Sequence, residues 1–219
     1  MGKSAIIFGA SGLVGNELAH LCAKVPGYET VVRVLRRAGD PITDVRDVIS
    51  EDITAVPDEE LRVDTLFCCL GTTMKRAGSK EAFELVDKAM PLTLAKRFAM
   101  LNPQGHFVVI TAMGADPDSS VYYNRVKGLL ERDLGLAKLG RLSIVRPSLL
   151  VGERSESRPM EALGIRLAPA MNALLWGPLK KYRAIEARDV AKAMIVCDLQ
   201  REGNAVYLSD ELQALTESL

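Results

Sequence analysis

Residues 3–15 read KSAIIFGASGLVG, and this stretch decides the fold. Its first half ends in an unbroken apolar run, which is typical of a strand covered on both faces. Gly9 then allows a sharp turn, Gly12 allows a pyrophosphate to approach the backbone, and Gly15 allows a helix to pack closely on the strand. The helix expected at residues 12–24 offers free N–H groups and its dipole to a phosphate. The stretch therefore predicts a dinucleotide-binding turn; the alternative is a purely structural glycine turn.

Strands and helices alternate along most of the chain. Further strands are expected at residues 30–35, 45–49, 64–70, 105–111, 142–146 and 205–208, and further helices at residues 80–100, 121–137 and 189–200. Pro91 is expected to kink the first of these helices, and Asp189 to cap the last. The alternation predicts an α/β fold, a Rossmann-like doubly wound parallel sheet with helices on both faces.

The chain becomes irregular after Pro147, because prolines and glycines recur through residues 147–184. This segment is interpreted as a small C-terminal loop-and-helix lobe over the carboxyl edge of the sheet, where it would cover a bound dinucleotide and its substrate. Residues 1–219 are interpreted as one Rossmann domain that includes this lobe.

Arg36 and Arg37 end the second predicted strand, where an acidic residue binds the ribose 2′-hydroxyl in sites that prefer NAD. No Asp or Glu lies between Val31 and Gly39. Two guanidinium groups can hold the 2′-phosphate of NADP through paired hydrogen bonds. The pattern predicts NADP(H) as the cofactor; the alternative is a solvated basic strand end.

Tyr123 and Lys127 form a YxxxK pattern inside a predicted helix. Positions i and i+4 lie on one helix face, so the phenol and the ammonium can act together. An unperturbed tyrosine has a pKa of about 10, and a nearby ammonium lowers it. Tyr123 can then exchange a proton with the oxygen of a carbonyl that receives a hydride. The alternative for such a common pattern is a helix-surface pair.

The glycine turn GASGLVG at residues 9–15, the YxxxK helix and Arg146-Pro147 together resemble the short-chain dehydrogenase/reductase superfamily. Three further segments, CCLGTT at residues 68–73, GADPDSSVYYNRVKG at 114–128 and RPSLLVGERSESRP at 146–159, are similar to one atypical branch. That branch is the Tat-interacting-protein (CC3-like) NADPH-binding family, in which this chain resembles a bacterial-type member. The resemblance covers nearly the whole chain.

This resemblance implies a Rossmann fold that binds NADPH, and it implies a role for particular residues. Tyr123 would be the proton donor and acceptor, and Lys127 would orient it and hold the nicotinamide ribose. The remaining cofactor-binding residues would be Gly9, Ser11, Gly12, Leu13, Val14 and Gly15 at the pyrophosphate, Arg36 and Arg37 at the 2′-phosphate, Leu70 and Gly71 after the fourth strand, and Leu150 and Arg158 over the cofactor.

One position departs from the superfamily pattern. A serine usually ends the fifth strand and hydrogen-bonds the substrate carbonyl, but its place in VVITAMGAD corresponds to Ala112, which cannot donate. Thr111 is the candidate for a substitute catalytic hydroxyl, and Ser119 and Ser120 lie nearby in a loop. The expected function is an NADPH-dependent oxidoreductase that reduces a small carbonyl or quinone-like substrate. The alternative is a non-catalytic, redox-sensing regulatory protein that binds NADP(H).

Composition narrows the function classes. The chain has 28 basic and 28 acidic side chains, so no electrostatic footprint for nucleic acid or a membrane surface is expected. The four cysteines show no metal-ligand spacing, and no metal site is expected. Neither a targeting signal nor a membrane-spanning apolar run is visible, which favours a cytoplasmic protein. The expected partners are a small-molecule substrate and either a protein partner or a second copy of the chain.

Overall fold

The computed structural model describes residues 2–151, 180, 182–200 and 203–217. The elements that position the site are, in chain order, β1 (Lys3–Phe8), α1 (Leu13–Cys22), β2 (Tyr28–Leu35), β3 (Arg46–Ile49), η1 (Ile53–Ala55), β4 (Thr65–Cys68), α2 (Met74–Ala77), α3 (Lys80–Glu84), η2 (Leu85–Ala89), α4 (Met90–Leu101), β5 (His106–Ile110), α5 (Tyr122–Gly135), β6 (Arg141–Arg146), β7 (Leu150–Val151), β8 (Ile185–Glu186), α7 (Ala187–Leu199), β9 (Ala205–Leu208) and α8 (Ser209–Thr216).

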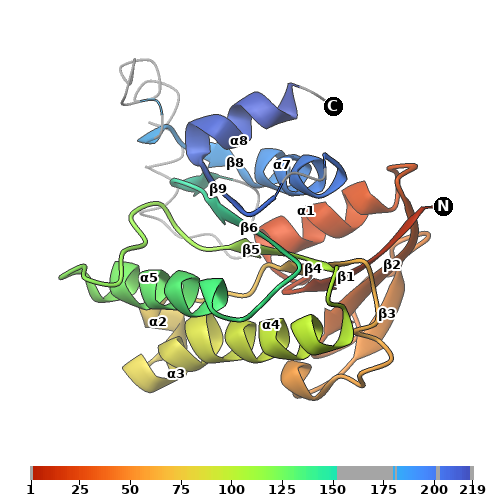
Figure 1. The fold of residues 1–219 in the computed structure, drawn as a ribbon, viewed down its shortest axis with the longest axis horizontal. Coiled ribbons are helices and arrows are strands. Elements are labelled where there is room, and N and C mark those ends of the chain that lie inside the picture. The colour runs from red at the N-terminus through yellow and green to blue at the C-terminus, as the bar shows by residue number, and fades with distance from the viewer. Residues whose placement is uncertain (1, 152–179, 181, 201–202, 218–219) are drawn as a thin grey trace.

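Seven strands form one parallel sheet in the order β3-β2-β1-β4-β5-β6-β9 (Figure 1). The chain winds outward from β1 in one direction to β2 and β3, and in the other through β4, β5 and β6 to β9. Ile6 lies opposite Val32 of β2 and Leu66 of β4, so β1 is hydrogen-bonded on both sides. The predicted doubly wound Rossmann-like fold is confirmed, and the strand expected at residues 205–208 is β9, which lies at one edge of the sheet.

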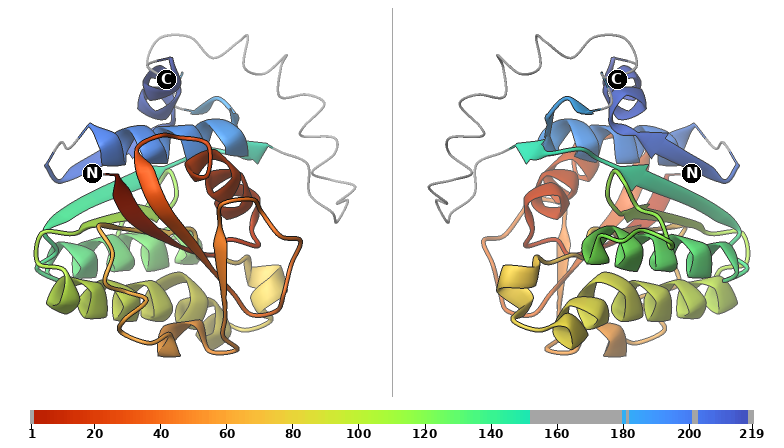
Figure 2. Two further views of the ribbon diagram at one scale, coloured as in Figure 1. Left: turned by 90° about the vertical axis from the view of Figure 1, so that its right-hand side faces the viewer. Right: turned by 90° about the vertical axis from the view of Figure 1, so that its left-hand side faces the viewer.

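Helices cover both faces of this sheet, with α1, α7 and α8 on one side and α4 and α5 on the other (Figures 1 and 2). Alternate residues of β1 belong to two separate cores. Ala5 and Ile7 pack in the core under α1 and α7, whereas Ile6 and Phe8 pack in the core under α4 and α5. The unbroken apolar run of β1 follows from this double burial.

The helix expected at residues 80–100 is interrupted, as the proline suggested. It comprises α3, the π-helical turn η2 and α4, with Pro91 in the first turn of α4. Proline has no N–H, and its ring clashes with the carbonyl four residues earlier, here that of Asp87. The wider π turn accommodates this clash, and its Asp87 is fully buried.

One expectation for the C-terminal part is corrected. Helix α7 begins at Ala187 with Glu186 as its N-cap residue, so Asp189 lies in the first turn and does not cap the helix. The helix begins two residues earlier than expected, and its first residue, Ala187, is buried in the core. Within the segment 147–184, β7 pairs in parallel with β8, which begins just after it, and residues 152–179 and 181 lie outside the described residues. In the part of the chain that the structure describes, no helix has the length and apolar character needed to cross a membrane.

Candidate functional site

The glycine turn lies between the ends of β1 and β4. Gly9 has φ +79°, and a Cβ there would lie 2.5 Å from the Cys69 carbonyl oxygen. A Cβ on Gly15 would lie 2.3 Å from the Gly9 carbonyl oxygen, so only glycine lets α1 pack this closely on the turn. These are the roles that the sequence assigned to the first and third glycines.

Helix α1 begins with its backbone donors available. Gly12 is the N-cap residue and has no side chain to cap the helix, and the first turn contains no acidic residue. Ser11 and Gly12 are exposed, whereas Val14 and Gly15 are buried. The exposed turn and the helix dipole together can hold an anion such as a pyrophosphate.

A pocket of about 650 Å³ adjoins this turn at the end of β2. Its lining includes Ser11, Arg36 and Arg37, with Glu51 on its wall. Arg33 also lines the pocket, but its guanidinium is paired with Asp47 of β3. Arg36 and Arg37 are both exposed, so their guanidinium groups are accessible to a phosphate in this pocket.

Lys127 is buried in α5 and forms an ion pair that the sequence did not reveal. Its Nζ lies 2.8 Å from Oδ1 of Asp87, and the two side chains are 3% and 0% exposed. Oδ2 of Asp87 accepts a hydrogen bond of 2.8 Å from the Thr72 backbone N–H. Gly71 closes over the pair, since a Cβ there would lie 3.4 Å from Asp87 Oδ1 and 3.6 Å from Lys127 Nζ. The predicted Lys127 and Gly71 are thus brought together at the end of β4.

Tyr123 lies one helical turn before Lys127 and is half-buried. Its ring packs on that of Phe83 from α3, with 5.6 Å between the centroids. Burial raises the pKa of Tyr123, the Lys127 charge opposes this rise, and the Asp87 charge adds to it. The expected lowering by the lysine is therefore present but is outweighed, because the phenol is desolvated and the lysine is paired.

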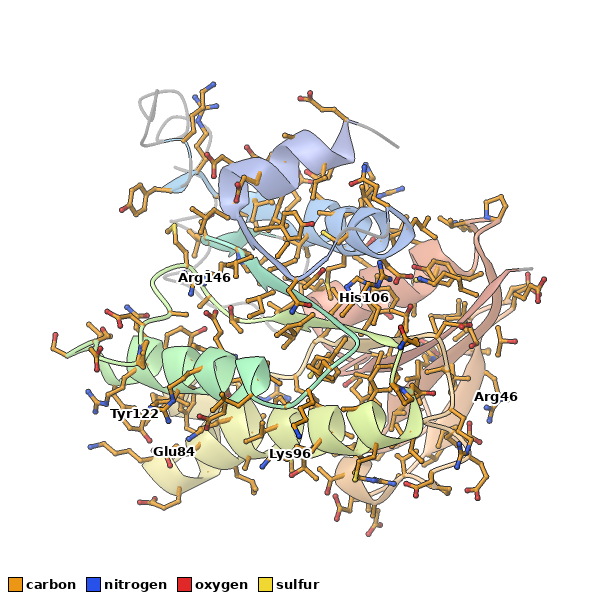
Figure 3. All side chains as sticks on the ribbon, viewed as in Figure 1. Arg46, Glu84, Lys96, His106, Tyr122 and Arg146 are labelled. Atoms are coloured by element: carbon orange, nitrogen blue, oxygen red, sulfur yellow. The ribbon has the colours of Figure 1, made fainter. Side chains whose placement is uncertain are left out.

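Tyr122 is engaged elsewhere. Its hydroxyl donates to Oε1 of Glu84 at 2.8 Å and to the Lys80 carbonyl oxygen at 3.2 Å, which ties α5 to α3 (Figure 3). In contrast, no residue in the described ranges hydrogen-bonds the Tyr123 hydroxyl. Of the two adjacent tyrosines, Tyr123 is the one whose hydroxyl is left for a ligand.

Thr111 has its hydroxyl committed to a neighbour. Oγ1 donates to Oε1 of Glu131 at 2.5 Å, and Glu131 also pairs with Arg146. Ala112 next to it is buried, and the Ser119 hydroxyl accepts from the Val121 N–H at 3.2 Å. In this arrangement the Thr111 proton is directed at Glu131 instead of a substrate oxygen.

The other predicted site residues are distributed as follows. Leu70 packs against the core under α4 and α5, directly before Gly71. Leu150 begins β7 and is half-buried. Arg158 lies outside the described residues.

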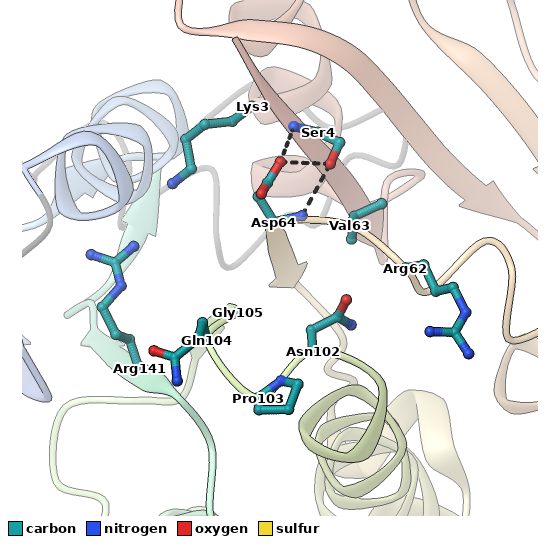
Figure 4. Close-up of a pocket in the computed structure, with 10 residues that line it drawn as sticks. All are labelled: Lys3, Ser4, Arg62, Val63, Asp64, Asn102, Pro103, Gln104, Gly105 and Arg141. Carbon is teal, nitrogen blue, oxygen red and sulfur yellow. Dashed lines mark hydrogen bonds between the residues drawn. The ribbon is translucent and has the colours of Figure 1, made fainter. Parts of the chain in front are cut away.

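A second pocket lies at the opposite edge of the sheet (Figure 4). Its lining includes Lys3 and Arg141, which begin β1 and β6, and Asp64, which precedes β4. The backbone N–H and the side-chain hydroxyl of Ser4 both donate to Oδ2 of Asp64 there. Because this is the amino-terminal edge of every strand, the pocket is remote from the glycine turn and is not part of the candidate site.

Comparison with known proteins gives the family. The HIM1 family model matches residues 42–176, more than half of the chain. FMP52 of Debaryomyces hansenii is 33% identical over 159 residues, covering 71% of this chain and 70% of that protein. HTATIP2 of Rattus norvegicus is 34% identical over 167 residues, covering 74% and 68%.

The chain belongs to the HIM1 family.

Solved structures share the fold of this HIM1 protein at low sequence identity. MoeE5 in complex with UDP-glucose and NAD has a TM-score of 0.69 and 16% identity, covering 98% of this chain and 81% of that one. The Bordetella bronchiseptica enzyme WbmH in complex with NAD⁺ has a TM-score of 0.69 and 18% identity, covering 94% and 75%. These likenesses confirm the Rossmann-like fold and do not distinguish NAD from NADP.

Membership of the HIM1 family supports the predicted resemblance but corrects two expectations. The relatives reported above are fungal and mammalian, so they give no support to a bacterial-type member. The FMP52 proteins of Debaryomyces hansenii and Candida albicans are named as mitochondrial, the latter 29% identical over 95% of this chain. The expectation of a cytoplasmic protein is therefore wrong. A missing targeting pattern is weak evidence, because such signals are compositional and contribute nothing to the folded core.

Proposed function

We propose that this HIM1 protein is an NADPH-dependent reductase of a small carbonyl or quinone-like substrate. The observation that carries the proposal is the position of Tyr123 and Lys127 at the carboxyl edge of the sheet. A Cβ on Gly71 would lie 3.6 Å from Lys127 Nζ, and a Cβ on Gly9 would lie 2.5 Å from the Cys69 carbonyl oxygen, so the end of β4 lies beside both Lys127 and the glycine turn. We infer that the arginine pocket, the glycine turn and Tyr123 belong to one surface at this edge of the sheet.

The residues along this surface fit an extended dinucleotide. Arg36 and Arg37 would hold a 2′-phosphate, the N–H groups of Ser11 and Leu13 would hold the pyrophosphate, and Lys127 would hold the ribose next to the nicotinamide. When bound, the reduced nicotinamide supplies a hydride to the substrate carbon. Tyr123 donates its hydroxyl proton to the substrate oxygen, which would otherwise develop an unfavourable negative charge in a half-buried site.

The test is NADPH oxidation by the purified protein with a panel of aldehydes, ketones and quinones. Turnover with at least one class is expected. NADPH binding without turnover of any member would favour the second candidate, a redox-sensing protein that binds NADP(H) without chemistry. The specific observation behind that candidate is the Thr111 hydroxyl, which is held by Glu131 while Ala112 offers no donor.

The cofactor preference gives a separate prediction for the double variant Arg36→Ala/Arg37→Ala. A hydrogen bond to a charged group contributes about 1.5–3 kcal/mol. The dissociation constant for NADPH should therefore rise about ten- to a hundredfold, while that for NADH stays nearly unchanged. Titration calorimetry with both cofactors measures this. Arg62→Ala, an exposed arginine at the opposite edge of the sheet, is the matched control. Equal weakening of both cofactors would show that the pair does not contact the 2′-phosphate.

A further inference from the structure

Asp87 is a charged residue in a position where a helix normally presents an apolar side chain. It follows the buried Phe83 by four residues and is itself completely buried. The π turn before Pro91 places its carboxylate at the end of β4, against Lys127 and the Thr72 N–H. A buried carboxylate is costly unless it is paired, so this position calls for a partner charge.

The charges around the Tyr123 hydroxyl come from several elements. Lys127 belongs to its own helix, and Asp87 faces it from η2. At the end of β4 the Cys68 thiol is fully buried, and burial raises its pKa to about 11, so it is neutral. Glu131, one turn beyond Lys127, is already paired with Arg146. Besides burial, which acts most strongly, the charges that act on Tyr123 are therefore those of Lys127 and Asp87.

We propose that Asp87 is a positioning residue that holds the Lys127 ammonium and cancels its charge, so that Tyr123 remains a phenol and serves as the proton donor for carbonyl reduction. This inference rests on the proposed reductase function. In the step itself the Tyr123 O–H bond breaks and its proton goes to the substrate oxygen, while the substrate carbon accepts the hydride from the reduced dinucleotide. The phenolate that remains then takes a proton from water.

The electrostatics of the site agree with this assignment. A lone ammonium beside Tyr123 would favour the phenolate, which is a proton acceptor and serves alcohol oxidation. Burial and the Asp87 carboxylate instead raise the pKa of Tyr123, and together they outweigh the lysine. A Tyr123 that stays protonated at neutral pH is suited to donating a proton in carbonyl reduction.

The test is a titration of Tyr123 that needs no substrate and no cofactor. The chain has 5 tyrosines, so carbon-13 labelling at tyrosine Cζ gives few signals, and Tyr123→Phe assigns the relevant one. Asp87→Asn removes the carboxylate charge at nearly constant shape. We expect the Tyr123 midpoint to fall by at least about one pH unit, a tenfold rise in the phenolate-to-phenol ratio. The alkaline limb of the reduction rate should move by the same amount.

Matched variants separate this role from a merely structural one. Glu84→Gln removes a carboxylate from the same helical segment, but one that binds Tyr122, and should leave the Tyr123 midpoint in place. The double variant Asp87→Asn/Lys127→Met removes both charges and avoids an unpaired buried ion, so it remains measurable even if Asp87→Asn does not fold. Its midpoint should lie close to that of the wild type.

Two results would overturn the proposal. One is an unchanged Tyr123 midpoint in folded Asp87→Asn. The other is a midpoint in the double variant that lies more than about one unit above the wild type, because this would mean that Lys127 acts on Tyr123 without cancellation. The titration is independent of turnover. A protein that shows the expected shifts but reduces no substrate would keep the Asp87 assignment and refute only the reductase function.

Discussion

Tyr123→Phe is expected to lower kcat for carbonyl reduction by at least about a hundredfold, the usual contribution of a positioned general acid. The substitution removes one oxygen and keeps the ring that packs on Phe83. Because no residue in the described part of the chain hydrogen-bonds that oxygen, the substitution removes no hydrogen bond within this part. NADPH affinity should therefore change little, and kcat and the dissociation constant should separate cleanly.

Steady-state kinetics and calorimetric NADPH binding on the same preparations measure this difference. Tyr122→Phe is the matched control, because it removes a hydroxyl from the adjacent tyrosine that instead binds Glu84 and the Lys80 carbonyl. The control should retain kcat. If Tyr123→Phe turns over substrate at the wild-type rate, then the proposed proton donor is wrong. If both proteins bind NADPH and neither reacts with any substrate, the redox-sensing alternative is favoured.

Asp198→Asn is expected to have the largest effect on stability, with a loss of about 3–5 kcal/mol in the free energy of unfolding. Asp198 of α7 is completely buried and joins five other elements, among them β6 through Arg141 at 3.4 Å. Its carboxylate pairs with Lys3 and accepts from Tyr28, Thr65 and His106, the last three at 2.8 Å. Removing the charge leaves Lys3 without its buried counter-ion at the amino-terminal edge of the sheet.

The same carboxylate should make stability depend on pH. Its hydrogen bonds and the Lys3 charge outweigh burial and lower the pKa of Asp198 from 3.8 to about 2. A depressed carboxyl pKa contributes stability that is present above 3.8 and is lost as the pH falls through about 2. Burial also lowers the pKa of His106 from 6.5, so protonation of the unfolded chain costs further stability below that pH. Both effects destabilise the fold on acidification.

Urea unfolding at a series of pH values checks both expectations. Between about pH 5 and pH 2, the wild type should lose stability more steeply than Asp198→Asn. The control is Asp189→Asn on the same helix, whose partly exposed carboxylate pairs only weakly with Lys192 at 3.6 Å and should change stability by less than about 1 kcal/mol. Parallel pH slopes for the wild type and Asp198→Asn would contradict the assignment.

The fold and part of the candidate site could be predicted from short stretches of sequence. Residues 3–15 combine an apolar strand with three spaced glycines, and each feature acts on atoms only a few residues away. The i, i+4 spacing places Tyr123 and Lys127 on one helix face for the same reason. Pro91 likewise predicted a break in its helix, because a proline lacks the backbone N–H that its own position in the helix requires.

The partners of these residues were decided only by the tertiary structure. Asp87 meets Lys127 across two packed elements, and Asp198 meets Lys3 across 195 residues of chain. The sequence contains one weak indication that Asp87 is buried, because this charged residue follows Phe83 by four positions on an otherwise apolar helix face. It contains no such indication for Asp198. The Thr111 hydroxyl also turned out to face Glu131 instead of a substrate.

The sequence by itself thus determined the parallel sheet, the glycine turn and the YxxxK face. The periodicity of apolar residues and the steric limits of the backbone both depend on residues close together in the chain. Only the tertiary structure decided which ionisable groups are buried together. Burial, desolvation and pairing depend on surfaces that distant segments bring into contact, and these determine whether Tyr123 is a phenol or a phenolate.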